Sequence, residues 1–173
     1  KASKYLNFRC LANIYFALIH SYINYANIVW ASSNRTGLKK IFQKQKQAMR
    51  IIFNKPYFSH SKPLMKNLKS LNVYQINLYQ IILFMYKVKM GTMPKIFNSN
   101  FTSVDHSYNT RFSLNSFQLP RSSKTSKFSI TLRGPKLWNN FLTDNEKNNP
   151  SFTSFKRNLK RKILDFDNEP TFF

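Results

Sequence analysis

Acidic residues are almost missing from this chain: six Asp and Glu stand against 28 Lys and Arg, giving a formal net charge of +22 over 173 residues. None of these acids lies in residues 1–104. Such a positive field repels itself and attracts polyanions. Codon bias in an AT-rich genome explains abundant Lys and Asn, but it would also enrich Asp and Glu. The composition therefore predicts RNA, DNA or an anionic membrane surface as the partner class.

Cysteine and glycine are also scarce. Cys10 is the only cysteine, so an internal disulfide and a cysteine-built zinc site are both excluded, which suits a reducing compartment. The glycines Gly37, Gly91 and Gly134 are far apart, so no glycine-rich phosphate loop can form. We expect no nucleotide cofactor of that kind in this chain.

Carboxylates and histidines are too sparse for an enzyme of nucleic-acid chemistry. Two-metal catalysis needs two or three carboxylates around ions about 4 Å apart, and Asp105 is the only acid before residue 144. His20, His60 and His106 lack the spacing of metal ligands. We therefore expect no catalytic centre, no metal site and no small-molecule substrate within this chain.

The most apolar stretch, residues 10–31, makes a poor membrane span because asparagines and a histidine interrupt it. A basic start before this stretch faintly resembles a signal peptide, but no small-residue cleavage site closes an apolar run. The sequence does not begin with Met, and we expect the chain to start inside a longer product. These features favour an intracellular protein, nuclear or cytoplasmic, that does not bind membranes.

Hydrophobic periodicity predicts a mainly α fold. Apolar residues at helical spacing indicate helices over 8–31 and 36–53, a short one over 64–71 and a last one over about 152–166. Residues 73–90 are apolar almost all round, which is typical of a helix in the middle of a bundle.

The second half of the chain is less regular. Residues 95–127 are rich in Ser, Asn and Thr and predict a loop or linker. Phe128, Ile130 and Leu132 alternate with polar residues, which predicts a short strand or hairpin before the Gly134–Pro135 turn and a short helix. The expected domains are a helical bundle at 1–94, the linker at 95–127, and a C-terminal extension with a short strand and a basic helix at 128–173.

Two basic helix faces are the candidate nucleic-acid interface, because Lys and Arg opposite an apolar stripe can reach phosphates. A solvated face that keeps the protein soluble is the alternative. Loop aromatics among the cations could stack on unpaired bases or plug the loops onto the core, whereas Trp30 and Trp138 are expected to be core anchors. Arg111 could bind phosphate or cap carbonyl groups. The expected cationic ligands are Lys39, Lys40, Lys44, Lys46, Arg50, Arg111, Lys156, Arg157, Lys160 and Arg161, and the loop aromatics are Tyr57, Phe58, Tyr108 and Phe112.

An ordered set of segments resembles the region downstream of the polymerase palm in jockey-like non-LTR retrotransposon reverse transcriptases. Order and spacing agree through most of residues 10–165, although no segment is a catalytic motif and residues 95–127 match loosely outside 106–111. The segments are Tyr15–Trp30, Leu38–Lys40, Gln45–Ile52, Pro63–Leu64, Ile82–Lys87, His106–Arg111, Gly134–Asn139 and Pro150–Lys156.

The resemblance implies a thumb-like bundle that grips the RNA or DNA backbone of a template–primer, next to fingers and palm of the same polyprotein. It implies Mg²⁺ only in that palm, whose Tyr-x-Asp-Asp motif this sequence lacks. We expect a non-catalytic part of an RNA-directed DNA polymerase. The alternatives are a basic structural protein of a ribonucleoprotein, an independent enzyme, and an amphipathic module on an anionic membrane.

Overall fold

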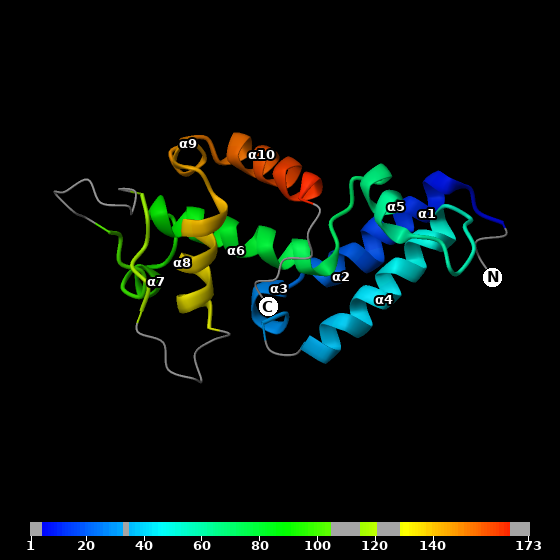
Figure 1. Ribbon diagram of the computed structural model, residues 1–173, viewed down its shortest axis with the longest axis horizontal. Coiled ribbons are helices and arrows are strands. Elements are labelled where there is room, and N and C mark those ends of the chain that lie inside the picture. The colour runs from blue at the N-terminus through cyan, green and yellow to red at the C-terminus, as the bar shows by residue number, and fades with distance from the viewer. Residues whose placement is uncertain (1–4, 33–34, 105–114, 121–128, 167–173) are drawn as a thin grey trace. The chain divides into compact units, whose positions relative to one another are not determined.

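The structure, a computed structural model, describes residues 5–32, 35–104, 115–120 and 129–166 and is mainly helical (Figure 1). This confirms the expected fold class at the level of a mainly α protein. The helical elements, in chain order, are α1 (Phe8–Ile14), the π-helix η2 (Tyr15–His20), α2 (Ser21–Asn24), α3 (Asn27–Trp30), α4 (Arg35–Ile52), α5 (Ser61–Asn67), α6 (Val73–Lys89), α7 (Lys95–Asn98), α8 (Ile130–Phe141), α9 (Asp144–Lys147) and α10 (Phe152–Asp165).

The chain forms two compact units. Residues 1–77 and 163–173 make the first unit, and residues 78–162 make the second. Helices α6 and α10 each contribute residues to both. These units are defined by contacts in space, whereas the domains expected from sequence follow changes in composition. The boundaries expected after residues 94 and 127 therefore stay predictions.

The helix expected over 8–31 is interrupted near its end. Helical structure runs from α1 through η2 and α2, but Ala26 has a positive φ of 46° before α3 begins. Asn27 explains the break, because its side-chain Nδ2 donates to the carbonyl of Ile23 at 3.0 Å. In a continuous α-helix that carbonyl would accept from the backbone N–H of Asn27. Asparagine side chains compete with the helical backbone in this way. The spacing of apolar residues in the sequence does not reveal such a hydrogen bond.

The core of the first unit lies between the N-terminal helices, α4 and α5. Tyr15, Met49 and Ile52 are buried there with Leu64 and Met65. The helical spacing of these residues in the sequence explains why α4 and α5 present them on one face.

Gln45 adds a buried polar centre to the same unit. Its Nε2 donates to the hydroxyl oxygen of Tyr15 at 2.8 Å and to the carbonyl of Leu71 at 2.9 Å. Its Oε1 accepts from the backbone N–H of Val73 at 3.0 Å, at the start of α6. One side chain of α4 thus satisfies groups from three other parts of the first unit.

The second unit packs around α6 and α8. Ile81, Ile82 and Met85 are fully buried, in agreement with the expected central position of the 73–90 helix. Trp138 is also fully buried, and its indole N–H donates to the carbonyl of Asn115 at 2.9 Å. The prediction that Trp138 anchors the core is therefore confirmed.

The strand expected at 128–132 is wrong where the structure describes it. Ile130 begins α8, and the Ser129 hydroxyl caps this helix by accepting from the N–H of Thr131 at 3.3 Å. The alternation was too short to outweigh the helical spacing of the buried residues that follow, up to Phe141. Gly134 and Pro135 lie inside α8 and do not form the expected turn. Phe128 lies outside the described residues.

The described parts of the expected linker carry some order. Helix α7 lies there, and Ser103 and Phe117 form an antiparallel bridge, the one β feature within the described ranges. Asn139 of α8 holds this bridge, because its side chain donates to the carbonyl of Phe117 at 2.8 Å and accepts from its N–H at 3.0 Å.

Candidate nucleic-acid interface

The two carboxylates that the structure describes in the second unit both form ion pairs with lysines of that unit. Glu146 lies 2.6 Å from Nζ of Lys162, and Asp144 lies 3.3 Å from Nζ of Lys147. Burial would raise the pKa of Glu146, but hydrogen bonds from Lys162 and from the backbone and hydroxyl of Thr143 outweigh it, so the pKa is lowered. Lys162 also donates to the carbonyl of Phe141 at 2.9 Å. It therefore stabilises α9 and does not belong to an open basic face.

The other four cations of α10 form an exposed face. Lys156, Arg157, Lys160 and Arg161 are all exposed, whereas Phe155, Leu159 and Ile163 of the same helix are buried. Within the described ranges no carboxylate forms an ion pair with any of the four. We name these four cations the α10 face. Their role as nucleic-acid ligands stays a prediction.

The cations of α4 divide into exposed and structurally engaged residues. Lys39, Lys40 and Lys44 are exposed, and we name them the α4 face. Lys46 is half-buried, with its Nζ 4.0 Å from the centroid of the Phe42 ring. Arg50 is half-buried too, and its Nε donates to the carbonyl of Ser59 at 2.8 Å. The sequence predicts all five in one interface, but Lys46 lies against a ring of its own helix and Arg50 also holds the loop that follows α4.

An apolar groove lies beside the α4 face. It measures about 740 Å³, and most of its lining residues are apolar, including Leu18, Tyr22 and Trp30. Lys40 and Lys44 line it as well. Trp30 is half-buried, and its indole N–H donates to the carbonyl of Tyr25 at 2.7 Å. Trp30 is thus part of a groove wall, and the expectation that it anchors the core is wrong.

Two exposed aromatic rings follow α4. Tyr57 is 67% exposed and Phe58 is 91% exposed, so neither plugs its loop onto the core. Their rings meet edge to face with centroids 5.3 Å apart, and the Arg50 guanidinium lies 5.5 Å from the Tyr57 ring centroid. This arrangement offers stacking surfaces beside a cation. Tyr108, Phe112 and Arg111, the other loop residues of the expected interface, lie outside the described residues.

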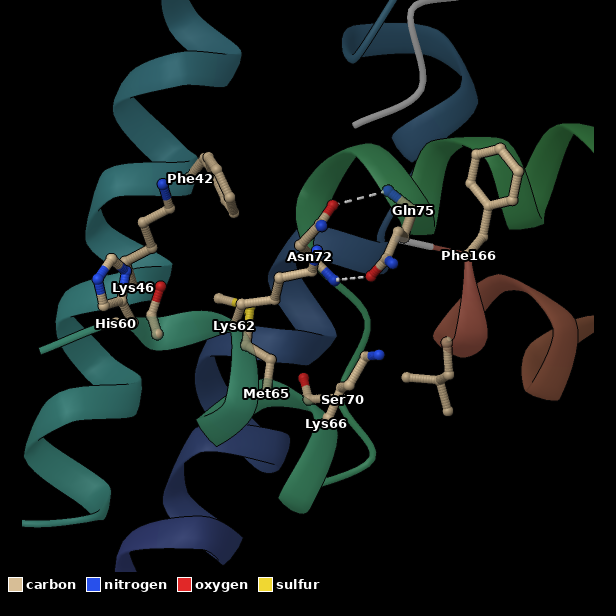
Figure 2. Close-up of a pocket in the computed structure, with 12 residues that line it drawn as sticks. Phe42, Lys46, His60, Lys62, Met65, Lys66, Ser70, Asn72, Gln75 and Phe166 are labelled. Atoms are coloured by element: carbon tan, nitrogen blue, oxygen red, sulfur yellow. Dashed lines mark hydrogen bonds between the residues drawn. The ribbon is translucent and has the colours of Figure 1, made fainter. Parts of the chain in front are cut away.

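A basic pocket in the first unit was not expected from the sequence. Figure 2 shows Lys46 and His60 on one side of it and Lys62 and Lys66 from α5 nearby. Its volume is about 260 Å³, and Asn72 also lines it. Lys62 and Lys66 are four residues apart, so the sequence alone predicts that they share one face of a helix. The sequence does not predict that α4 lies beside this face of α5.

The described residues hold no group of three His, Cys, Asp or Glu side chains placed to bind a metal ion. Cys10 is exposed. No helix in the described ranges has both the length and the apolar character to cross a membrane. The groups available for binding in the described residues are exposed cations and exposed aromatic rings. Comparisons of the chain with protein-family models, with curated proteins and with solved structures find no match.

Proposed function

We propose that this protein binds the phosphate backbone of RNA or DNA through the α4 face in the first unit and the α10 face in the second. The carrying observation is that the cations of both faces are exposed and form no ion pair with a carboxylate in the described ranges. Lysine and arginine in this state bind phosphates and release the counterions condensed on them. Backbone contacts of this kind carry little base information, so binding is indifferent to sequence.

The resemblance to jockey-like reverse transcriptases supports a more specific form of this proposal. In that form the chain is a non-catalytic, thumb-like part of an RNA-directed DNA polymerase and grips the template–primer. The coding sequence upstream of Lys1 tests it directly. A palm with paired aspartates upstream is the expected result, and an unrelated upstream coding sequence would remove the polymerase assignment while leaving backbone binding intact.

Charge-neutralising variants test backbone binding by the two faces. Fluorescence anisotropy compares the wild-type chain with a triple variant of the α4 face, Lys39→Gln, Lys40→Gln and Lys44→Gln. The matched control replaces three exposed lysines elsewhere, Lys55→Gln, Lys95→Gln and Lys136→Gln. Both variants lose the same net charge, so a difference between them reports position on the α4 face.

Each lost phosphate contact should reduce the salt slope of log K by about 1. We expect the α4 variant to reduce the slope by about 3, with the control changing it much less. A second variant that neutralises Lys156, Arg157, Lys160 and Arg161 examines the α10 face in the same way. Equal effects of face and control variants would mean that net charge alone drives binding, and would contradict the two-face proposal.

The apolar groove favours a second candidate, a basic structural protein of a ribonucleoprotein. An exposed apolar groove bordered by Lys40 and Lys44 fits an amphipathic helix that carries acidic residues beside its apolar anchors. Under this candidate Leu18→Asp abolishes incorporation into the particle, and the chain shows no preference for primed duplex over single strands. A clear preference for primed duplex favours the polymerase proposal instead.

A further inference from the structure

The apolar groove of the first unit gathers exposed hydrophobic side chains from several elements. Leu18 and Ile19 belong to η2, Tyr22 belongs to α2, and Ile41 of α4 completes this apolar surface. Leu18 is 57% exposed and Tyr22 is 78% exposed. The helix η2 is a π-helix, a rare form that is frequent at functional sites. Exposed apolar surface collected in one groove marks an interaction site, whereas scattered exposed residues do not.

Two polar side chains of the lining are already bonded within the protein. The indole N–H of Trp30 donates to the carbonyl of Tyr25 at 2.7 Å. The amide of Gln45, which is buried, is bonded to three partners elsewhere in the first unit. These bonds hold the lining in place before any ligand binds. The other polar groups of the lining belong to exposed side chains, those of Tyr22, Lys40 and Lys44.

The lining therefore favours apolar side chains over nucleobases. A base placed in the groove would bury its polar edge against apolar residues, and a buried polar group without a partner costs free energy. An apolar side chain carries no such group and gains from leaving water. The volume of about 740 Å³ has room for several large side chains.

Lys40 and Lys44 determine the charge that an occupant should carry. They are four residues apart on α4, so they lie on one side of that helix, about 6 Å apart along its axis. Both are exposed, and neither forms an ion pair or a hydrogen bond in the described part of the chain. Two carboxylates at a matching spacing on the occupant would pair with them.

A helix fits this groove better than an extended segment does. An amphipathic helix places apolar anchors at positions i, i+3 or i+4 and i+7, and it docks into grooves between helices. Strand addition needs an exposed sheet edge, and the one β feature within the described ranges is the isolated bridge in the second unit. A second copy of this chain is disfavoured as the occupant, because each copy carries a net charge of +22.

We propose that this groove docks an amphipathic helix of a partner protein, with acidic residues of that helix paired to Lys40 and Lys44. Because these lysines also belong to the α4 face, docking withdraws them from the phosphate backbone. The docking step is independent of the proposed function, whereas the competition with nucleic acid rests on it. In the ribonucleoprotein candidate the groove only attaches the chain to a particle. Here its occupancy also weakens nucleic-acid binding.

The competition must act in both directions by the same factor, because the two ligands are thermodynamically linked. Coupling between two sites commonly changes affinity by about 5–150-fold. We expect the docked helix to weaken duplex binding at least about fivefold, near the lower end of that range. The salt slope of log K should fall by about 2, since two phosphate contacts are lost.

Acrylamide quenching of tryptophan fluorescence tests docking in the full chain. The chain has two tryptophans, and Trp138 is fully buried, so quenching reports on Trp30 in the groove. The probe is a synthetic helical peptide without tryptophan that carries leucines along one face and two glutamates four residues apart beside them. We expect this peptide to protect Trp30 from quenching. A peptide of the same composition in scrambled order should not protect it.

Truncation of the apolar anchors should abolish this protection. Leu18→Ala with Tyr22→Ala should weaken peptide binding roughly tenfold or more, because a few central apolar contacts dominate such interfaces. Both side chains are exposed in the free protein, so the variant keeps its fold, which circular dichroism checks. Tyr5→Ala with Val29→Ala is the matched control, since both residues are exposed and lie outside the lining. This control should bind the peptide as the wild-type chain does.

Anisotropy of a labelled duplex tests the competition. The amphipathic peptide should lower the affinity of the wild-type chain for the duplex, and the scrambled peptide should not. Leu18→Ala with Tyr22→Ala retains every cation of the α4 face, so it should bind the duplex normally and ignore the peptide. Lys40→Gln with Lys44→Gln should weaken peptide binding more than Lys55→Gln with Lys95→Gln, a control of equal net charge at exposed positions.

Several results would assign the groove to another occupant and overturn the proposal. Equal protection of Trp30 by the scrambled peptide would mean that net charge alone attracts the peptide. Protection by vesicles containing phosphatidylserine, with none by the peptide, would assign the groove to an anionic membrane. Protection that rises with protein concentration alone would assign it to a second copy. If Asp167→Asn with Glu169→Gln increased affinity for the amphipathic peptide only, the C-terminal segment of this chain would be the occupant.

Failure of this inference can be distinguished from failure of the proposed function. Docking of the peptide with unchanged duplex affinity overturns the competition and leaves backbone binding standing. Unprotected Trp30 at saturating peptide, with steep salt dependence of duplex binding retained, overturns docking alone. Absence of nucleic-acid binding in dilute buffer overturns the proposed function and the competition, and the quenching of Trp30 then still decides whether the helix docks.

Discussion

Nε2 of Gln45 donates a hydrogen bond to the buried hydroxyl of Tyr15 across 2.8 Å, joining residues 30 positions apart in the sequence. Burial raises the pKa of Tyr15, although hydrogen bonds with Gln45 and Ser70 lower it in part. A raised pKa means that the neutral hydroxyl is the folded form, so stability is lost as the pH rises above about 10. Gln45 lies on α4, and its amide also bonds to Leu71 and Val73. These bonds connect α4 to the other elements of the first unit.

Gln45→Leu should destabilise the first unit strongly. The variant leaves the Val73 N–H without its partner, and it leaves the Leu71 carbonyl with only the longer hydrogen bond from the Ser70 hydroxyl, at 3.5 Å. A buried unsatisfied group costs about 1–3 kcal/mol. Chemical denaturation followed by circular dichroism measures the loss. Gln47→Leu, at an exposed position of the same helix, is the matched control and should change stability by less than about 0.5 kcal/mol. Similar effects of both variants would mean that the network is not stabilising.

Gly134→Ala should loosen the packing of α8 on α6. A Cβ at this position would lie 2.6 Å from Sδ of Met85, which is fully buried and has little room to move. Overpacking of this kind costs about 1–3 kcal/mol. Thermal unfolding compares this variant with Asn140→Ala, an exposed position of α8. Because alanine favours helix over glycine, a more stable Gly134→Ala protein would show that the close approach is absent.

The Glu146–Lys162 pair predicts a pH-dependent contribution to stability. The folded pKa of Glu146 is lowered, so its stabilising effect is present above the unfolded value of about 4.3 and is lost as the pH falls through the folded pKa. Glu146→Gln should cost about 1 kcal/mol at neutral pH, since both groups are partly exposed. The difference from wild type should shrink below about pH 4. Asp165→Asn, at an exposed acid, controls for lost negative charge.

Phe58→Ala should weaken binding to single strands selectively. The ring is 91% exposed, so its removal costs little stability. Stacking of a base on an aromatic ring contributes about 1–3 kcal/mol, and duplex ends offer few unstacked bases. Anisotropy with single-stranded and duplex probes checks this. A loss of the same size for both probes would show that Phe58 acts otherwise than by stacking.

Long periodic segments were the predictable part of this fold. Helices α4 and α6 lie within about one residue of their expected bounds because their apolar patterns extend over several turns. The break at Ala26 was missed because one side-chain hydrogen bond, from Asn27 to Ile23, decides it. The strand expected at 128–132 was wrong because a short alternation also fits the start of a helix.

In the candidate site too, local patterns could be predicted from the sequence and contacts between distant residues could not. Cations opposite an apolar stripe are visible in sequence, and those of the α10 face are exposed as such a pattern predicts. The engagement of Arg50 with Ser59 was not visible, since it depends on how the following loop turns back. The basic pocket requires Lys46 and Lys62 to meet from different helices, and no local pattern encodes that meeting.

The salt dependence of binding to an RNA or DNA duplex of arbitrary sequence tests the central claim most directly. With roughly 6–10 phosphate contacts, affinity should fall by about 10³–10⁵ between about 50 and 200 mM salt, and equally for unrelated sequences. A flat response over that range, or no binding in dilute buffer, would contradict nucleic-acid binding by the α4 and α10 faces.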